Sequence, residues 1–246
     1  MARGLELTTE TIQHWLDSPI ESAPFLLALT IAAFYLSNLA YRATQSFPFL
    51  HPTVAGAVLV AATLPLLEVN YARYIDANQA LMFLLGPATV ALAIPLYQQL
   101  PLIRKMALPI LITCITGACF AAGVALVIAA LLGAEQTVLL SLAPKSVTTP
   151  IAISVANEIG GIASLAAGAV AITAVLSIFF APYVFKWLGI DDPAQWGFCL
   201  GITGHGMGTA RAFEINAQAG AFASLAMCLT GTFSAVIIPI SFSLLR

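Results

Sequence analysis

Two short polar stretches interrupt a chain in which only 8% of the residues are charged. The first reads Pro-Lys-Ser-Val-Thr-Thr-Pro and holds Lys145 together with the hydroxyl groups of Ser146, Thr148 and Thr149. An ammonium, three hydroxyls and the unpaired N–H groups of a helix that begins after the break would suit a small anion such as a carboxylate. The alternative is that Lys145 extends toward a membrane interface or pairs with Glu158.

The second stretch is rich in glycine and carries His205, Thr209 and Arg211. A guanidinium can hold a carboxylate in a bidentate fork, which selects for geometry as well as charge. An imidazole titrates near neutral pH, so His205 could carry a coupling proton or could pack as a neutral side chain. Glu214 lies one helical turn after Arg211, and an ion pair between them is the competing interpretation of Arg211.

Two further polar residues, Asn157 and Glu158, end the segment that contains Lys145. Glu158 and Glu214 could act as counter-charges or proton carriers, or could simply be solvated at helix ends. The sequence contains no pattern typical of a nucleophile elbow, a phosphate-binding loop or a zinc site, and no basic patch suited to nucleic acid. We therefore expect neither an enzyme nor a bound cofactor or metal.

The rest of the chain is unusually apolar, with 60% hydrophobic residues and a mean hydropathy of +0.97. A charge-free window of about 20 residues is long enough to cross a bilayer. The composition predicts an all-α polytopic membrane protein with about 6–8 transmembrane segments. We expect segments at residues 24–41, 52–67, 79–98, 106–132, 137–157, 160–186, 195–216 and 220–245. For 137–157 and 195–216, a full crossing and a re-entrant hairpin both remain open.

Proline and glycine interrupt several of these segments, so we expect two or more discontinuous helices. An internal repeat also emerges when the sequence is shifted by 60 residues. The shift aligns residues 160–166 with 220–226, Lys145 with His205, and Thr149 with Thr209. The repeat would consist of a broken segment followed by a long helix, a pattern with which secondary transporters build substrate sites. Plain proline kinks and chance similarity between glycine- and alanine-rich segments are the alternatives.

The start of the chain is more polar than the rest. Residues 1–23 are predicted to form an extramembrane segment with a short amphipathic helix, followed by one transmembrane domain over 24–246. Positively charged residues flank spans on the cytoplasmic side of a membrane. Arg42, Arg104 and Lys105 would then lie in the cytoplasm and the amino terminus outside.

The two polar stretches, over residues 142–152 and 204–212, and a third stretch over 220–226 resemble the LrgB/CidB family, which includes YohK-like bacterial proteins. Family members read Ser-His-Ala where this chain has Gly204-His205-Gly206, so a hydroxyl beside the histidine is lost. The family is similar to the plant plastid glycolate/glycerate transporter. The resemblance implies a protein of the bacterial cytoplasmic (inner) membrane.

The resemblance implies two alternative functions. One is a carrier of small monocarboxylates of the pyruvate, glycolate and glycerate class. The other is a holin/antiholin-like protein that modulates murein hydrolases and lysis beside a small LrgA/CidA-type membrane partner.

The residues favour the carrier, because a holin-like pore does not require charged groups within broken segments. We expect a homo-oligomer in contact with lipid, with possible proton or sodium coupling. The expected substrate site comprises Lys145, Ser146, Thr148, Thr149, His205, Thr209 and Arg211.

Overall fold

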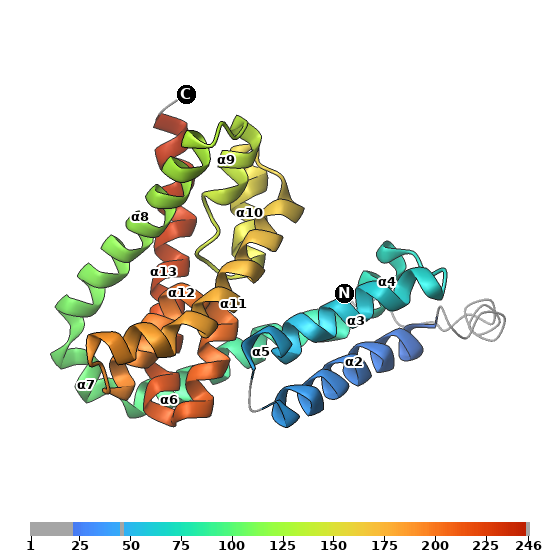
Figure 1. The fold of residues 1–246 in the computed structure, drawn as a ribbon, viewed down its shortest axis with the longest axis horizontal. Coiled ribbons are helices and arrows are strands. Elements are labelled where there is room, and N and C mark those ends of the chain that lie inside the picture. The colour runs from blue at the N-terminus through green and yellow to red at the C-terminus, as the bar shows by residue number, and fades with distance from the viewer. Residues whose placement is uncertain (1–21, 45–46, 245–246) are drawn as a thin grey trace, which may run out of the picture. The chain divides into compact units, whose positions relative to one another are not determined.

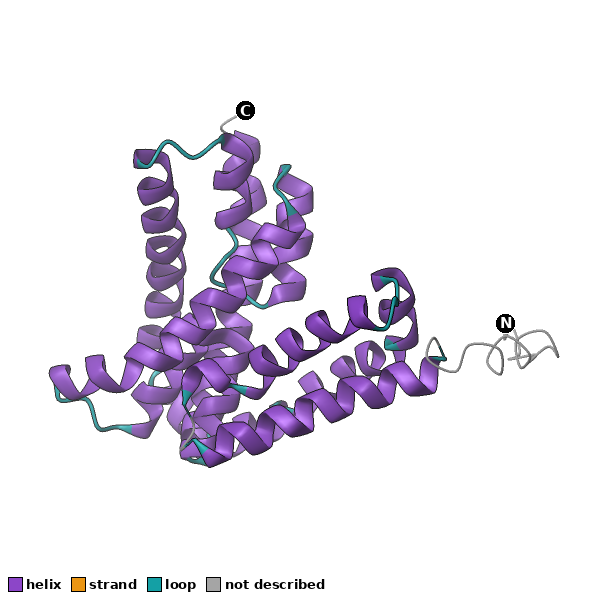
Figure 2. Cartoon of the chain, turned by 45° about the vertical axis from the view of Figure 1, so that its right-hand side comes forward, coloured by secondary structure: helices purple, strands orange, loops and turns teal. Residues whose placement is uncertain are grey.

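The computed structural model describes residues 22–44 and 47–244, and their regular secondary structure is entirely helical (Figure 2). Five of the described helices are long and apolar enough to cross a membrane. The helix Pro52–Leu66 is also apolar but is shorter than these five. The prediction of an all-α membrane protein is confirmed. The predicted amphipathic helix of the amino-terminal segment lies outside the described residues.

The elements fall into two compact units that divide between Val90 and Ala91. The first unit contains α2 (Ala23–Ala43), η2 (Pro48–Leu50), α3 (Pro52–Leu66), α4 (Tyr71–Ala77) and α5 (Gln79–Ala91), the last of which ends at the division. Leu26 and Ala33 of α2 pack with Val60 and Leu64 of α3 in a buried apolar core. Both polar stretches lie in the second unit.

The second unit contains α6 (Ala93–Gln98), α7 (Leu100–Lys105), α8 (Ala107–Leu131), α9 (Gln136–Leu142), α10 (Thr149–Ile159), α11 (Ala163–Leu188), α12 (Pro193–Ile215) and α13 (Ala217–Leu244). Its frame is the pair α8 and α13, which run side by side in the same direction (Figure 1). Ile110 near the start of α8 packs with Phe222 near the start of α13, and Leu126 packs with Ile238 near their ends. The two helices therefore provide a common axis for the remaining elements.

Residues 136–159 fold back on themselves, and we call them hairpin 1. Its outward limb is α9 followed by the non-helical residues 143–148, and its return limb is α10. Ile159 at the end of α10 packs with Leu140 of α9 and with Ile238, and the Ile162 N–H donates a hydrogen bond to Ser141 Oγ at 2.7 Å. Hairpin 1 therefore enters and leaves the unit at the C-terminal ends of α8 and α13 (Figure 1).

Residues 193–215 of α12 also fold back, and we call them hairpin 2. His205 has the non-helical angles φ 48° and ψ −125°, which separate residues 193–204 from 206–215. A Cβ at Gly208 would lie 2.1 Å from the Leu200 carbonyl oxygen. Because positions eight residues apart in a straight helix are about 12 Å apart, this short distance means that the two halves lie against each other. Leu200 and Ala212 also share one apolar cluster.

Hairpin 2 begins at the opposite end of the frame from hairpin 1. Ala194 in its first turn packs with Ile110 and Phe222, at the N-terminal ends of α8 and α13. α11 connects the two ends, because Ala166 near its start packs against hairpin 1 and Ile178, further along, packs against hairpin 2. α11 therefore runs opposite to α13.

The alternative left open for residues 137–157 and 195–216 is thus decided in favour of hairpins. Residues 136–244 consist of a hairpin followed by a long helix, twice over, and the two copies run in opposite directions. This is the arrangement of an inverted repeat. The 60-residue offset that aligns Lys145 with His205 corresponds to the two hairpin tips.

Candidate functional site

Proline residues account for the break in hairpin 1. Pro144 follows the end of α9, and Pro150 occupies the first turn of α10, where its missing N–H costs nothing. Between them, Thr148 adopts an extended backbone with φ −69° and ψ 149° and serves as the N-cap residue of α10. The break therefore places Lys145 near the tip of the hairpin, in the turn that leads to the first N–H groups of α10.

The two hairpin tips meet. Lys145 and the backbone of Ser146 lie close enough to the imidazole of His205 to interact with it. The Lys145 Nζ donates a hydrogen bond to Ser146 Oγ at 3.1 Å; Lys145 is half-buried and Ser146 is buried. We call Lys145, Ser146 and His205 the tip centre.

His205 is the most unusual member of the tip centre. Its side chain is 2% exposed, yet neither ring nitrogen has a hydrogen-bond partner of standard geometry within the described residues, although the Ser146 backbone lies beside the ring. An unsatisfied buried polar group costs about 1–3 kcal/mol, so proteins keep such groups mainly where a water or ligand completes them. The backbone at this residue is also in the left-handed half of φ space, which a side chain rarely adopts.

The tip centre lies near the middle of the long helices. A Cβ at Gly204 would lie 3.7 Å from Cβ of Ser177 in α11, and a Cβ at Gly231 would lie 3.1 Å from Cδ1 of Ile151 in α10. Ser177 and Gly231 are close to the midpoints of α11 and α13. Broken helices that meet at this depth are tolerated where protein or a polar cavity satisfies their backbone.

Three threonines flank the tip centre in the sequence. Thr148 and Thr149 are half-buried beside Lys145, and Thr209 is buried in the first turns after His205, with its hydroxyl 3.7 Å from Met227 Sδ. Each hairpin thus supplies one basic side chain at its break and a threonine at the start of its return helix. This correspondence matches the repeat seen in the sequence.

The structure does not place Arg211 with the tip centre. Its guanidinium forms an ion pair with Glu214, three residues further along the same helix. Arg211 lines a cavity at the open end of hairpin 2 together with Asp191 and Trp196. The competing interpretation of Arg211 is the one observed, because the carboxylate one turn away is nearer than the hairpin tip.

Asn157 and Glu158 also lie away from the tip centre. Both are exposed near the end of α10, and Glu158 is ten residues beyond Thr148, about 15 Å along the helix. In the described part of the chain, the Lys145 ammonium donates to Ser146 and forms no salt bridge with Glu158. Neither residue lies beside the Lys145 ammonium, and the counter-charge roles expected of them stay predictions.

The separation of Arg211 from the tip centre leads to a prediction. For the carrier expected from the sequence, Arg211→Gln should lower uptake by less than about fivefold, because the exposed Arg211–Glu214 pair is worth under about 1 kcal/mol and about 1.4 kcal/mol corresponds to tenfold. Glu214→Gln and the double variant should behave alike within the same margin. Initial rates of uptake into proteoliposomes measure the effect. A loss as large as that of a tip-centre variant would show that Arg211 binds substrate.

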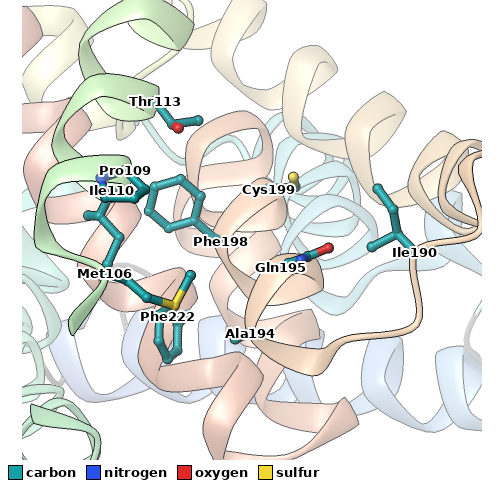
Figure 3. Close-up of a pocket in the computed structure, with 10 residues that line it drawn as sticks. All are labelled: Met106, Pro109, Ile110, Thr113, Ile190, Ala194, Gln195, Phe198, Cys199 and Phe222. Carbon is teal, nitrogen blue, oxygen red and sulfur yellow. The ribbon is translucent and has the colours of Figure 1, made fainter. Parts of the chain in front are cut away.

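A well-formed cavity of about 270 Å³ lies elsewhere, between the start of α8 and the first half of hairpin 2 (Figure 3). Met106 and Pro109 of α8, Phe198 of hairpin 2 and Phe222 of α13 line it, with Thr113 and Gln195 as its only polar residues among those drawn. It offers no charge to an anion. Among the described residues, no group of three or more His, Cys, Asp or Glu side chains could hold a metal ion.

Three structural residues had little or no recognisable signal in the sequence. Ser141 is fully buried and fastens the base of hairpin 1 through its bond from Ile162. Gly197 and Gly201 allow hairpin 2 to touch the backbone of α13, where a Cβ would lie 1.9 Å from the Ala219 oxygen and 2.2 Å from the Ala223 oxygen. The Gly-x-x-x-Gly spacing is a known signal for close helix packing, although it does not identify the partner.

Comparison with known proteins identifies the family. Residues 30–244 match the sequence model of the LrgB-like family. The chain belongs to this family. LrgB-like relatives include the uncharacterised protein YxaC of Bacillus subtilis (strain 168), 36% identical over 84% of this chain and 90% of the relative. An uncharacterised protein of Haemophilus influenzae is 32% identical over 88% of this chain and 94% of its own length.

Several LrgB-like relatives have a functional name, antiholin-like protein LrgB. The antiholin-like protein LrgB of Bacillus subtilis (strain 168) is 30% identical over 88% of this chain and 94% of its own length. No solved structure matches the chain. The names of the relatives therefore support the antiholin-like alternative more directly than the carrier, and they name no substrate.

Proposed function

We propose that this LrgB-like protein is a secondary carrier of small monocarboxylates, of the pyruvate, glycolate and glycerate class. The observation that carries the proposal is the meeting of two opposed hairpins at Lys145 and at a buried His205, whose ring nitrogens have no hydrogen-bond partner of standard geometry among the described residues. A pore has no need for such a centre, whereas a carrier of anions needs one. Discontinuous helices that meet near mid-bundle are how several transporter folds hold their substrates.

The proposed site is built around one positive charge. The Lys145 ammonium would hold the carboxylate, and the N–H groups at the start of α10 would add further donors. His205 could donate to a second oxygen, and the hydroxyls of Ser146, Thr148, Thr149 and Thr209 are the remaining polar groups. This set suits a small acid with a 2-oxo or 2-hydroxy group.

We place the protein in the bacterial cytoplasmic membrane with its amino terminus outside. Arg104 and Lys105 end α7 next to the start of α8, and Lys186 lies in the last turn of α11, which runs the opposite way. The three charges therefore gather at the end where hairpin 2 enters, and that end would face the cytoplasm. Proton or sodium coupling and a homo-oligomeric state belong to the same proposal.

The second candidate is an antiholin-like regulator of murein hydrolases, working with a small LrgA/CidA-type membrane partner. The specific observation in its favour is the name of the LrgB relatives. A regulator of this kind would not need to move carboxylates by itself.

Reconstitution separates the two candidates. Purified protein in liposomes should take up labelled pyruvate or glycolate, with saturation and competition between the two acids, while retaining an encapsulated dye. Release of the dye would indicate a pore. The absence of uptake of either acid, both with and without a proton or sodium gradient, would contradict the carrier.

A further inference from the structure

The two hairpins are attached to the frame in different ways, and the difference determines which of them can move. Hairpin 2 touches α13 through backbone. At Gly197 and Gly201 an added Cβ would collide with the carbonyl oxygens of Ala219 and Ala223, so no side chain separates the two helices. Such contacts fit in one arrangement only, because a packed interface without intervening side chains cannot slide by small adjustments.

Hairpin 2 is also held on its other sides. Ile202 packs with Cys114 of α8 and Ala226 of α13 in one buried cluster, and its Cγ2 would lie 3.6 Å from a Cβ at Gly117. Leu200 packs with Ile178 of α11. Hairpin 2 and α13 therefore form one tightly packed body, and α8 packs on it through the buried cluster around Ile202.

Hairpin 1 is held by side chains instead. Ala152 and Ala156 of α10 pack on Ala166 and Val170 of α11, and Ile151 reaches Gly231 of α13 with the end of its side chain. Apolar side-chain contacts of this kind permit shear or hinge motion between packed helices. At the end of the outward limb, the N–H groups of Ala143 and Lys145 still bond to Leu139 and Leu142, but residues 146–148 donate no helical hydrogen bond within the described chain, and segments with few such bonds open most easily.

The base of hairpin 1 is held by backbone contacts, whereas its tip is held by side chains such as Val147, which packs with Ala166 and Val170 of α11. Ser141 Oγ accepts the hydrogen bond from Ile162, and a Cβ at Gly161 would lie 2.9 Å from the Ser141 nitrogen. Between α10 and this contact stands Gly160, whose φ of 91° favours glycine. Because the base is fixed and lies next to a glycine, hairpin 1 could pivot there. The displacement would then be greatest at the tip that carries Lys145.

We propose that hairpin 1 is the moving gate of the tip centre, pivoting at Gly160 and Gly161 against the fixed body of hairpin 2 and α13. Opening would carry Lys145 away from His205 and admit solute from the end where hairpin 1 enters. An anion bound between them would hold the tips together, so that occupancy and closure are coupled. A role of the gate in transport rests on the proposed carrier function. The motion of hairpin 1 itself does not depend on that function.

Two engineered disulfides test this gate in a background in which Cys114, Cys119, Cys199 and Cys228 are replaced by alanine. Ile151→Cys with Gly231→Cys would tie hairpin 1 to α13, and Gly117→Cys with Ile202→Cys would tie hairpin 2 to α8. The reduced form of each double variant is its own folding control. Hydrogen–deuterium exchange in lipid nanodiscs, read by mass spectrometry on peptides covering residues 143–149 and 197–204, follows the motion without any substrate.

In the reduced proteins, residues 143–149 should exchange faster than residues 197–204. Oxidation of the first pair should slow exchange of 143–149 by roughly tenfold, whereas oxidation of the second pair should leave it unchanged. Equal exchange of the two segments, or no slowing by the first disulfide, would overturn the gate.

Pyruvate uptake into proteoliposomes is measured on the same four samples and on the wild type. It should stop with the first disulfide, return on reduction and persist with the second. Slowed exchange together with a wild type that takes up neither pyruvate nor glycolate, with or without a proton or sodium gradient, would refute the carrier and leave the gate intact. Full uptake through the first disulfide would refute the gate and leave the carrier intact.

Discussion

Lys145→Ala is expected to lower the uptake of pyruvate or glycolate by about 100-fold, with little change in thermal stability. Removing one partner of a desolvated ion pair typically costs 2–5 kcal/mol, and 100-fold corresponds to about 2.7 kcal/mol. Lys145 is the only cation at the tip centre among the described residues, since Arg211 faces Glu214. No neighbouring positive charge can therefore substitute for it.

Lys186→Ala is the matched control, because Lys186 is exposed in the last turn of α11. Its uptake should stay within about twofold of wild type, as for an exposed surface charge. Lys145→Arg should retain part of the activity, since it keeps the charge but changes the donor geometry. Equal uptake by wild type and Lys145→Ala would remove Lys145 from the proposed site, whatever the substrate.

The largest effect on stability is expected at Gly201 and Gly197. Gly201→Ala should destabilise the protein by about 3 kcal/mol, because the new methyl would meet the Ala223 oxygen at 2.2 Å and force hairpin 2 away from α13. For a chain of this size the loss corresponds to a fall in melting temperature of roughly 10 °C. Gly197→Ala, at 1.9 Å from the Ala219 oxygen, should be at least as severe.

Gly123→Ala in α8 and Gly168→Ala in α11 are the matched controls, because nothing lies within 4 Å of a Cβ at either position. Both should be neutral or stabilise by up to about 1 kcal/mol, since alanine is the better helix former. Thermal unfolding in detergent measures all four variants. A melting temperature for Gly201→Ala equal to that of the controls would contradict the close packing of hairpin 2 on α13.

The repeat could be predicted from the sequence because its two copies use similar residues at the same positions, at the hairpin tip and at the start of the long helix. Gly160 to Ala166 and Gly220 to Ala226 are alike since each stretch covers part of the first turns of a long helix that packs tightly beside its hairpin. The alignment of Lys145 with His205 follows from the same architecture. It does not reveal direction, because a repeat that runs forward and one that runs backward have the same sequence pattern.

Arg211 illustrates why part of the site could not be predicted. Its residue type suits a carboxylate equally well whether that carboxylate belongs to a substrate or to Glu214. The choice depends on which group lies nearer in space. In the folded chain the ion pair forms near the open end of hairpin 2, away from the tip that carries His205.

The sequence by itself determined that this is a helical membrane protein, where its apolar helices run, and that proline and glycine break two segments beside Lys145 and His205. These properties are local, because they depend on hydrophobicity and on backbone preferences within one segment. Only the tertiary structure decided that both broken segments fold back, that they enter from opposite ends, and that their tips meet. Those outcomes depend on contacts between residues far apart in the chain, such as Ile159 with Ile238 and Gly201 with Ala223, which no local pattern specifies.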